Sequence, residues 1–92
     1  MTKEQLAAVL EISSAKLGSD GWSKLPEGRT LNFYAAHDGV QLVIPRVEAI
    51  ATQGDLVKAR TAKQEIFVVA LADLFAASTE ANNAPARRAG FI

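Results

Sequence analysis

The stretch TLNFYAAHDGVQLVIP, from Thr30 to Pro45, places two alternating runs on either side of an Asp-Gly pair. Apolar side chains take every second position in both runs, at Leu31, Phe33, Ala35, Val40, Leu42 and Ile44. Alternation with a period of two indicates β-strands that bury one face. Asp38-Gly39 is typical of a two-residue hairpin turn, because glycine tolerates positive φ and aspartate tolerates the left-handed region. The stretch therefore predicts a β-hairpin whose first strand ends at His37.

The residues that follow this hairpin predict further strands of the same sheet. Pro45 has no N–H to donate, so it predicts a bend or a strand end. The segment RVEAIAT, residues 46–52, is either a third strand or a single helical turn, because its apolar residues are three apart. LVKARTA, residues 56–62, predicts a strand, and EIFVVAL, residues 65–71, predicts a central strand that is covered on both faces. Short connections require neighbouring strands to pair antiparallel.

Helices are predicted before and after the strands. Thr2 and Gln5 form a capping-box pattern, and the apolar residues after it follow helical spacing. This amphipathic helix is expected to pack on one face of the sheet. LADLFAAS, residues 71–78, predicts a short C-terminal helix with one apolar side that consists of Leu71, Leu74 and Phe75.

The 92-residue chain has room for one domain. We expect an α+β fold in which the N-terminal helix packs on a small antiparallel meander of four or five strands, or a partly closed β-barrel. A single domain over residues 1–78 is expected. The last residues, 79–92, show no periodicity and are rich in alanine and asparagine, which predicts a flexible C-terminal tail.

The composition argues against several kinds of chemistry. Ten basic and ten acidic residues balance to a net charge of zero, and the chain has one histidine and no cysteine. A zinc site needs histidine or cysteine ligands, so we expect no metal. Neither the G-x-G-x-x-G nor the P-loop pattern of a phosphate-binding loop occurs, so we expect no cofactor. Asp38 is expected to point away from His37, which leaves the imidazole without an orienting partner and predicts a non-enzymatic protein. The longest apolar run, IFVVALA, is too short to span a membrane, which favours a soluble cytoplasmic protein.

Trp22 is the one aromatic residue in a predicted loop, SDGWSKLPEGR, residues 19–29. An indole in a loop either packs against the protein or offers a platform for a ligand. Packing is favoured, because large aromatic side chains are mostly buried.

Apolar surface in the C-terminal half favours a protein–protein interaction. One helix covers only one face of a small sheet, so the strand Glu65–Leu71 is expected to need a partner on its other face. The sequence ends in AGFI, which is either a docking peptide or simply a frayed terminus. We expect a small regulatory or adaptor module, and a homodimer with Glu65–Leu71 near its interface. The expected partner-binding residues are Phe67, Val69, Leu71, Leu74, Phe75, Phe91 and Ile92.

A nucleic-acid-binding function is the alternative hypothesis. The run from Gly39 to Leu74 resembles the β-rich half of LytTR-type DNA-binding domains, through its Ile-Pro step, its Gly-Asp-x-Val turn and its Thr-ended strand. These positions are Ile44, Pro45, Gly54, Asp55, Val57 and Thr61. A helix before a bent five-stranded barrel also resembles Sm-like folds. The basic residues that would contact phosphate are Lys58, Arg60, Lys63, Arg87 and Arg88.

Overall fold

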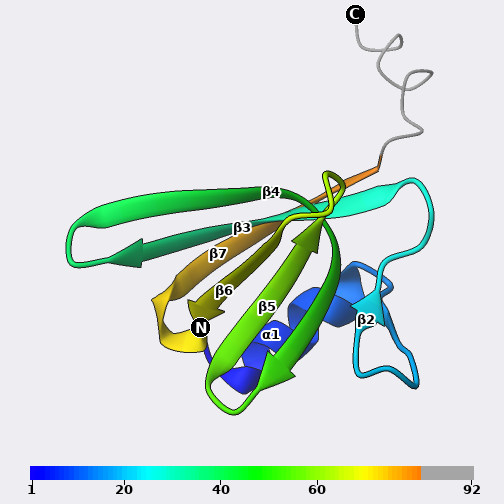
Figure 1. The fold of residues 1–92 in the computed structure, drawn as a ribbon, viewed down its shortest axis with the longest axis horizontal. Coiled ribbons are helices and arrows are strands. Elements are labelled where there is room, and N and C mark those ends of the chain that lie inside the picture. The colour runs from blue at the N-terminus through cyan, green and yellow to red at the C-terminus, as the bar shows by residue number, and fades with distance from the viewer. Residues whose placement is uncertain (82–92) are drawn as a thin grey trace, which may run out of the picture.

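The structure is a computed structural model that describes residues 1–81 (Figure 1). One helix precedes a curled antiparallel sheet, which confirms the α+β class. The elements in chain order are α1 (Lys3–Ile12), β1 (Lys16–Leu17), β2 (Ser23–Lys24), β3 (Arg29–His37), β4 (Val40–Gln53), β5 (Leu56–Thr61), β6 (Ile66–Ala70), the 3₁₀ turn η1 (Leu71–Asp73) and β7 (Leu74–Ala81).

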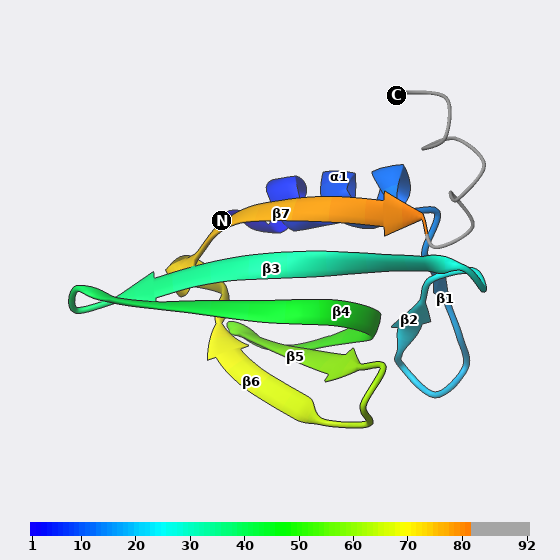
Figure 2. The ribbon, with the colours of Figure 1, turned by 90° about the horizontal axis from the view of Figure 1, so that it is seen from above.

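The sheet is a half-barrel in which β4 is the longest strand. β4 pairs with β3 through its first half and with β5 through its second half. β7 pairs with the other edge of β3, and β6 pairs with the other edge of β5. Figure 2 shows the resulting order β7, β3, β4, β5, β6, with β6 at the margin of the sheet. The short β1–β2 ribbon joins the second half of β4.

A bulge at Pro45 and Arg46 bends β4 and so curls the sheet. Both residues stand opposite the single residue Asn32 of β3, because Ile44 pairs with Phe33 and Val47 with Leu31. Arg46 has a φ of 54°, and its N–H donates to Asn32 Oδ1 at 3.1 Å. The predicted bend at Pro45 is confirmed. Of the two alternatives for residues 46–52, the strand is correct, as a continuation of β4.

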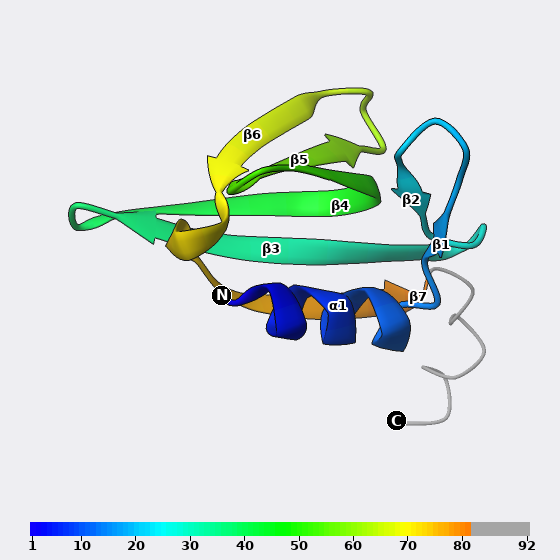
Figure 3. The ribbon, with the colours of Figure 1, turned by 90° about the horizontal axis from the view of Figure 1, so that it is seen from below.

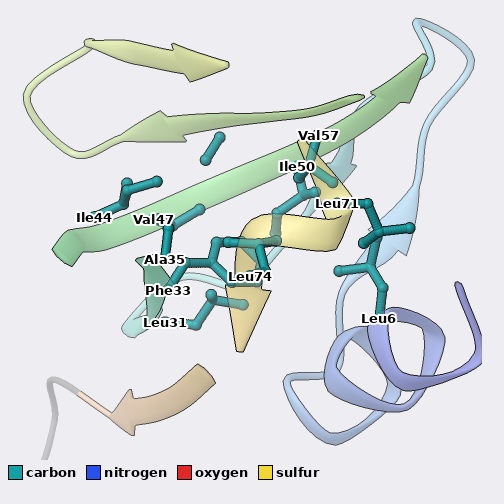
Figure 4. Packing of buried hydrophobic residues seen from close by; sticks show 11 residues of the cluster. Leu6, Leu31, Phe33, Ala35, Ile44, Val47, Ile50, Val57, Leu71 and Leu74 are labelled. Atoms are coloured by element: carbon teal, nitrogen blue, oxygen red, sulfur yellow. The ribbon is translucent and has the colours of Figure 1, made fainter. Parts of the chain in front are cut away.

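The core lies on the concave face of the curled sheet (Figure 4). The predicted alternation of inward-facing residues in Thr30–Pro45 is confirmed for Leu31, Phe33, Ala35 and Ile44, all of which are buried. The other residues of the buried cluster are Leu6, Val47, Ile50, Val57, Ala59, Leu71 and Leu74. Val40 and Leu42 share the inward face but are 69% and 42% exposed. Their exposure follows from the β3–β4 hairpin, which projects beyond the other strands (Figure 1).

The N-terminal helix begins as the sequence predicts. Thr2 Oγ1 accepts from the Gln5 N–H at 3.0 Å, and Gln5 Oε1 accepts from the Thr2 N–H at 2.8 Å, which completes the capping box. In Figure 3, α1 lies at the β7 side of the sheet, and β6 lies at the opposite side. Leu6 is the helix residue that is buried in the core, and it lies next to Leu71 (Figure 4).

The predicted C-terminal helix over residues 71–78 is wrong. Only Leu71–Asp73 form a turn of 3₁₀ helix, and Leu74–Ala81 form β7. The open edge of β3 explains the difference, because β7 pairs with it along its whole length and so gives hydrogen-bond partners to the edge groups of β3. The predicted domain boundary at residue 78 falls within β7, which runs to Ala81. Residues 82–92, with most of the predicted tail, lie outside the described part.

Candidate interaction surfaces

β6 is an edge strand, and not the central covered strand that its apolar sequence predicts. Within residues 1–81 it pairs only with β5. Phe67 and Val69 pack against the core from its inner face. Ile66 and Val68 point outward and are 55% and 56% exposed. The strand thus combines an unpaired edge with an exposed apolar row.

The hydrogen bonds at the two ends of β6 show which of its backbone groups face the open edge. The Thr61 N–H donates to the Glu65 carbonyl, and the Leu71 N–H donates to the Asp55 carbonyl, each at 2.8 Å. In an antiparallel pair, residues alternate between bonding their partner strand and facing away from it. Residues 65, 67, 69 and 71 therefore bond to β5. The N–H and C=O groups of Ile66, Val68 and Ala70 point to the open edge.

The other predicted partner-binding residues are divided between the core and the surface. Leu71 and Leu74 are buried in the core. Phe75 lies on the outer face of β7, is 60% exposed and has its ring centroid 6.4 Å from that of Tyr34. Phe91 and Ile92 lie outside the described residues. The predicted triplet of Leu71, Leu74 and Phe75 therefore does not form one surface.

The predicted basic residues of β5 lie on the outer face of the sheet. Lys58 pairs with Val68 and Arg60 with Ile66, so both cations share the face of the exposed apolar row. Lys63 lies in the β5–β6 turn, and Arg87 and Arg88 are outside the described residues. The Arg60 guanidinium lies 5.0 Å from the ring centroid of Trp22. Trp22 is therefore held on the outer face by a cation–π contact.

Sequence reasoning missed two lysines of the same face, because they become neighbours only through strand pairing. Lys16 pairs with Lys24, Lys24 pairs with Ala49, and Ala49 pairs with Arg60. Paired residues point to the same side of a sheet. A row of three cations thus crosses β1, β2, β4 and β5. Ala49 is fully buried although it belongs to this outer row, which is consistent with cover from the Trp22–Arg60 stack.

Asp20 joins the Trp22 loop to this basic row. Its Oδ1 accepts from the Trp22 N–H at 3.1 Å, and its Oδ2 lies 3.5 Å from Lys24 Nζ. The hydrogen bond from Trp22 and the charge of Lys24 lower the pKa of the Asp20 carboxyl from its ordinary value of 3.8. The carboxylate is thus favoured in the folded loop.

We expect the Trp22 loop to loosen in acid. A carboxyl whose pKa is lowered by folding stabilises the folded form above its ordinary pKa of 3.8, and this contribution is lost as the pH falls through the lowered value. Fluorescence of the chain's single tryptophan should therefore stay constant from pH 7 to the ordinary pKa and shift below it. Asp20→Asn should give the shifted emission at pH 7 with an unchanged far-ultraviolet circular dichroism spectrum. Identical titrations of the two proteins would contradict this role of Asp20.

His37 lies at the end of the β3–β4 hairpin, as predicted. Asp38 and Gly39 have φ values of 50° and 81°, which confirms the hairpin turn. The expectation that Asp38 points away is wrong, because its Oδ2 lies 3.4 Å from His37 Nε2. Asp73 of η1, which sequence reasoning missed, places Oδ1 3.1 Å from His37 Nδ1. Each ring nitrogen thus faces a carboxylate, and Asp73 supplies the orienting partner that the sequence did not predict for His37.

Two of the cavities formed by residues 1–81 lie near the β4–β5 turn and near the β3–β4 hairpin. One of about 360 Å³ separates α1 from the β4–β5 turn, and its lining is mostly apolar with Lys3 as its charged residue. The other, of about 200 Å³, lies beside His37 under the projecting hairpin. Residues 1–81 hold no cluster of three histidine or acidic side chains suited to a metal ion. No helix in that range is long and apolar enough to cross a membrane.

Comparison of the chain with known protein families, with curated proteins and with solved structures gives no significant match. The β6 edge and the basic outer face are the two surfaces whose chemistry is specific enough to suggest a partner.

Proposed function

We propose that this chain is a non-enzymatic, cytoplasmic protein-interaction module that forms a homodimer through the edge of β6. The observation that carries the proposal is the edge of β6 that has no partner strand within residues 1–81, where Ile66, Val68 and Ala70 direct their backbone groups outward. An open edge is a template for another strand. A second copy of the chain offers the same edge, and closed two-fold dimers are the commonest oligomers.

The β6 edge lacks the features that proteins use to prevent edge pairing. Its sequence, IFVVA, has no charged residue and no proline. Lysine, proline and bulges are the usual protection of exposed edges. β7, the other margin of the sheet, carries instead the exposed polar residues Thr79 and Glu80 just before its last residue. This difference between the two edges favours β6 over β7 as the edge that a partner covers in the assembled protein.

An antiparallel pairing of two β6 strands is self-complementary. A two-fold axis beside Val68 would place Val68 opposite Val68 of the second copy and Ile66 opposite Ala70. All of these residues have backbone groups that face the edge, so each pair would exchange two N–H···O bonds. Their side chains share the outer face, where apolar cross-strand pairs add stability. The two half-barrels would then form one continuous sheet.

We expect Val68→Pro to abolish the dimer. Proline removes the N–H at the centre of the proposed pairing, but Val68 donates no bond to β5, so the fold should survive. Size-exclusion chromatography with light scattering, at tens of micromolar protein, should give a mass of two chains for the wild type and one for the variant. Ile12→Lys is the matched control, because it changes an exposed apolar residue on α1.

Three results would overturn the proposal. A wild-type mass of one chain would remove the dimer. A mass of three chains would contradict the two-fold pairing, because an odd number of chains cannot all pair their β6 edges two by two. An unchanged dimer in a Val68→Pro protein with native circular dichroism would exclude β6 from the interface.

A further inference from the structure

We propose that the outer face of β1, β2, β4 and β5 binds single-stranded nucleic acid. The face combines the row of Lys16, Lys24 and Arg60 with Lys58 on the same side of β5. The indole of Trp22 lies among these cations through its stack on Arg60. Cations that follow a backbone, with an aromatic surface for a base, are the two components of single-strand recognition. The proposal does not depend on the β6 dimer.

The cations of this face repel one another and have few partners of their own. Lys16 stands directly opposite Lys24, and like charges in that position destabilise a sheet. Asp20 is the one carboxylate in residues 1–81 that forms an ion pair on this face, and it pairs with Lys24. Lys16, Lys58 and Arg60 form no ion pair within the same residues. A bound polyanion would relieve this repulsion, although the net charge of the whole chain is zero.

The shape of the face favours an extended strand over a small anion. Neighbouring strands lie about 4.8 Å apart, so the row from Lys16 to Arg60 spans roughly 14 Å across three strand steps. That span exceeds one phosphate group and matches a short run of nucleotides. The guanidinium of Arg60 and the indole of Trp22 present flat π surfaces, on which bases of any sequence stack. We therefore expect binding with little dependence on base sequence.

The experiment uses the full chain and a fluorescein-labelled 12-nucleotide oligothymidylate. Anisotropy gives the dissociation constant, and Trp22, as the single tryptophan, reports contact at the site itself through quenching. Each phosphate contact contributes about 0.7 to the slope of log Kd against log salt for single strands. Four cations predict a slope of about 2.8, which weakens binding about 50-fold between 50 and 200 mM salt.

Three variants test the assignment. Lys16→Gln with Lys58→Gln should reduce the salt slope to about 1.4, so that the same salt step weakens binding about sevenfold. Arg60→Lys should keep the slope but weaken binding at least about fivefold, because the charge remains and the stacked plane is lost. Lys3→Gln, which removes a lysine of α1 on the other side of the molecule, should leave the slope and the affinity unchanged.

Several outcomes would overturn the proposal. One is the absence of binding at 20 mM salt, and another is binding without Trp22 quenching, which places the contact elsewhere. Equal slopes of log Kd against log salt for the wild type and for the Lys16→Gln, Lys58→Gln variant would also contradict it. Retention on phosphatidylserine vesicles without oligonucleotide binding would assign the face to a membrane instead. The monomeric Val68→Pro variant should still bind through one intact face, so failure of the dimer and failure of this site are distinguishable.

Discussion

Replacing Phe33 by alanine is expected to lower the free energy of unfolding by about 3 to 5 kcal/mol. Phe33 is fully buried and lies in the middle strand of three, between Ile44 of β4 and Ala77 of β7. Its removal leaves a cavity that the surrounding strands cannot fill, because their side chains are held by the ladder. Small domains have a total stability of about 5 to 15 kcal/mol. Urea unfolding, followed by circular dichroism, should show a much lower midpoint with a similar slope.

Phe75→Ala is the matched control for this experiment. It makes the same chemical change on the neighbouring strand, but at a side chain that is 60% exposed. Its contact with the ring of Tyr34 is the interaction that is lost, and aromatic pairs contribute about 0.5 to 1.5 kcal/mol. If Phe33→Ala lowered the free energy of unfolding no more than Phe75→Ala does, the concave face would not be the core of the protein.

Asn32→Ala is expected to destabilise the protein by about 2 kcal/mol. The amide oxygen accepts from the Arg46 N–H at 3.1 Å, and the amide nitrogen donates to Ser78 Oγ at 3.0 Å and to Glu80 Oε1 at 3.2 Å. A typical hydrogen bond contributes about 1 kcal/mol. Arg46 is also held at positive φ, which is costly for a residue other than glycine. Asn32 therefore supports the bulge that curls β4.

Asn32 contacts both the bulge, through the Arg46 N–H, and β7, through the Ser78 hydroxyl. Ser78→Ala removes only the second contact. The hydroxyl of Ser78 contacts Asn32 and Tyr34 but not the bulge, so its loss should cost about 1 kcal/mol. Urea unfolding measures both variants, and hydrogen exchange at the Arg46 amide should accelerate only in Asn32→Ala. Equal stability losses with unchanged exchange at Arg46 would contradict a special role for Asn32 at the bulge.

Local signals in the sequence predicted the parts of the fold that depend on neighbouring residues. The Asp38-Gly39 turn and the Thr2–Gln5 capping box each need only a few residues in a fixed order, and both are confirmed. The alternation of Leu31, Phe33 and Ala35 is confirmed for the same reason. These features are stabilised within a single turn or a single strand, so their residue types identify them.

The parts that failed depend on residues that are distant in the sequence. The spacing of Leu71 and Leu74 suits a helix, but the free edge of β3 makes a strand more favourable. The apolar sequence of Glu65–Leu71 resembles a buried strand, and nothing within it shows that no other strand of residues 1–81 pairs with its second edge. The contact of His37 with Asp73 and the row through Lys16 and Lys24 arise from tertiary pairing. No local pattern contains that information.

The pairing of β7 with β3 has a consequence for how the chain folds during synthesis. β3 is made early, whereas β7 is the last of the described strands to leave the ribosome. Until then one edge of β3 has no hydrogen-bond partner, and Leu74 is missing from the core. Pairing between strands so distant in sequence slows folding, and a waiting strand edge is open to wrong partners. Until β7 has been made, the nascent chain therefore exposes this edge of β3, where wrong pairing and aggregation can start.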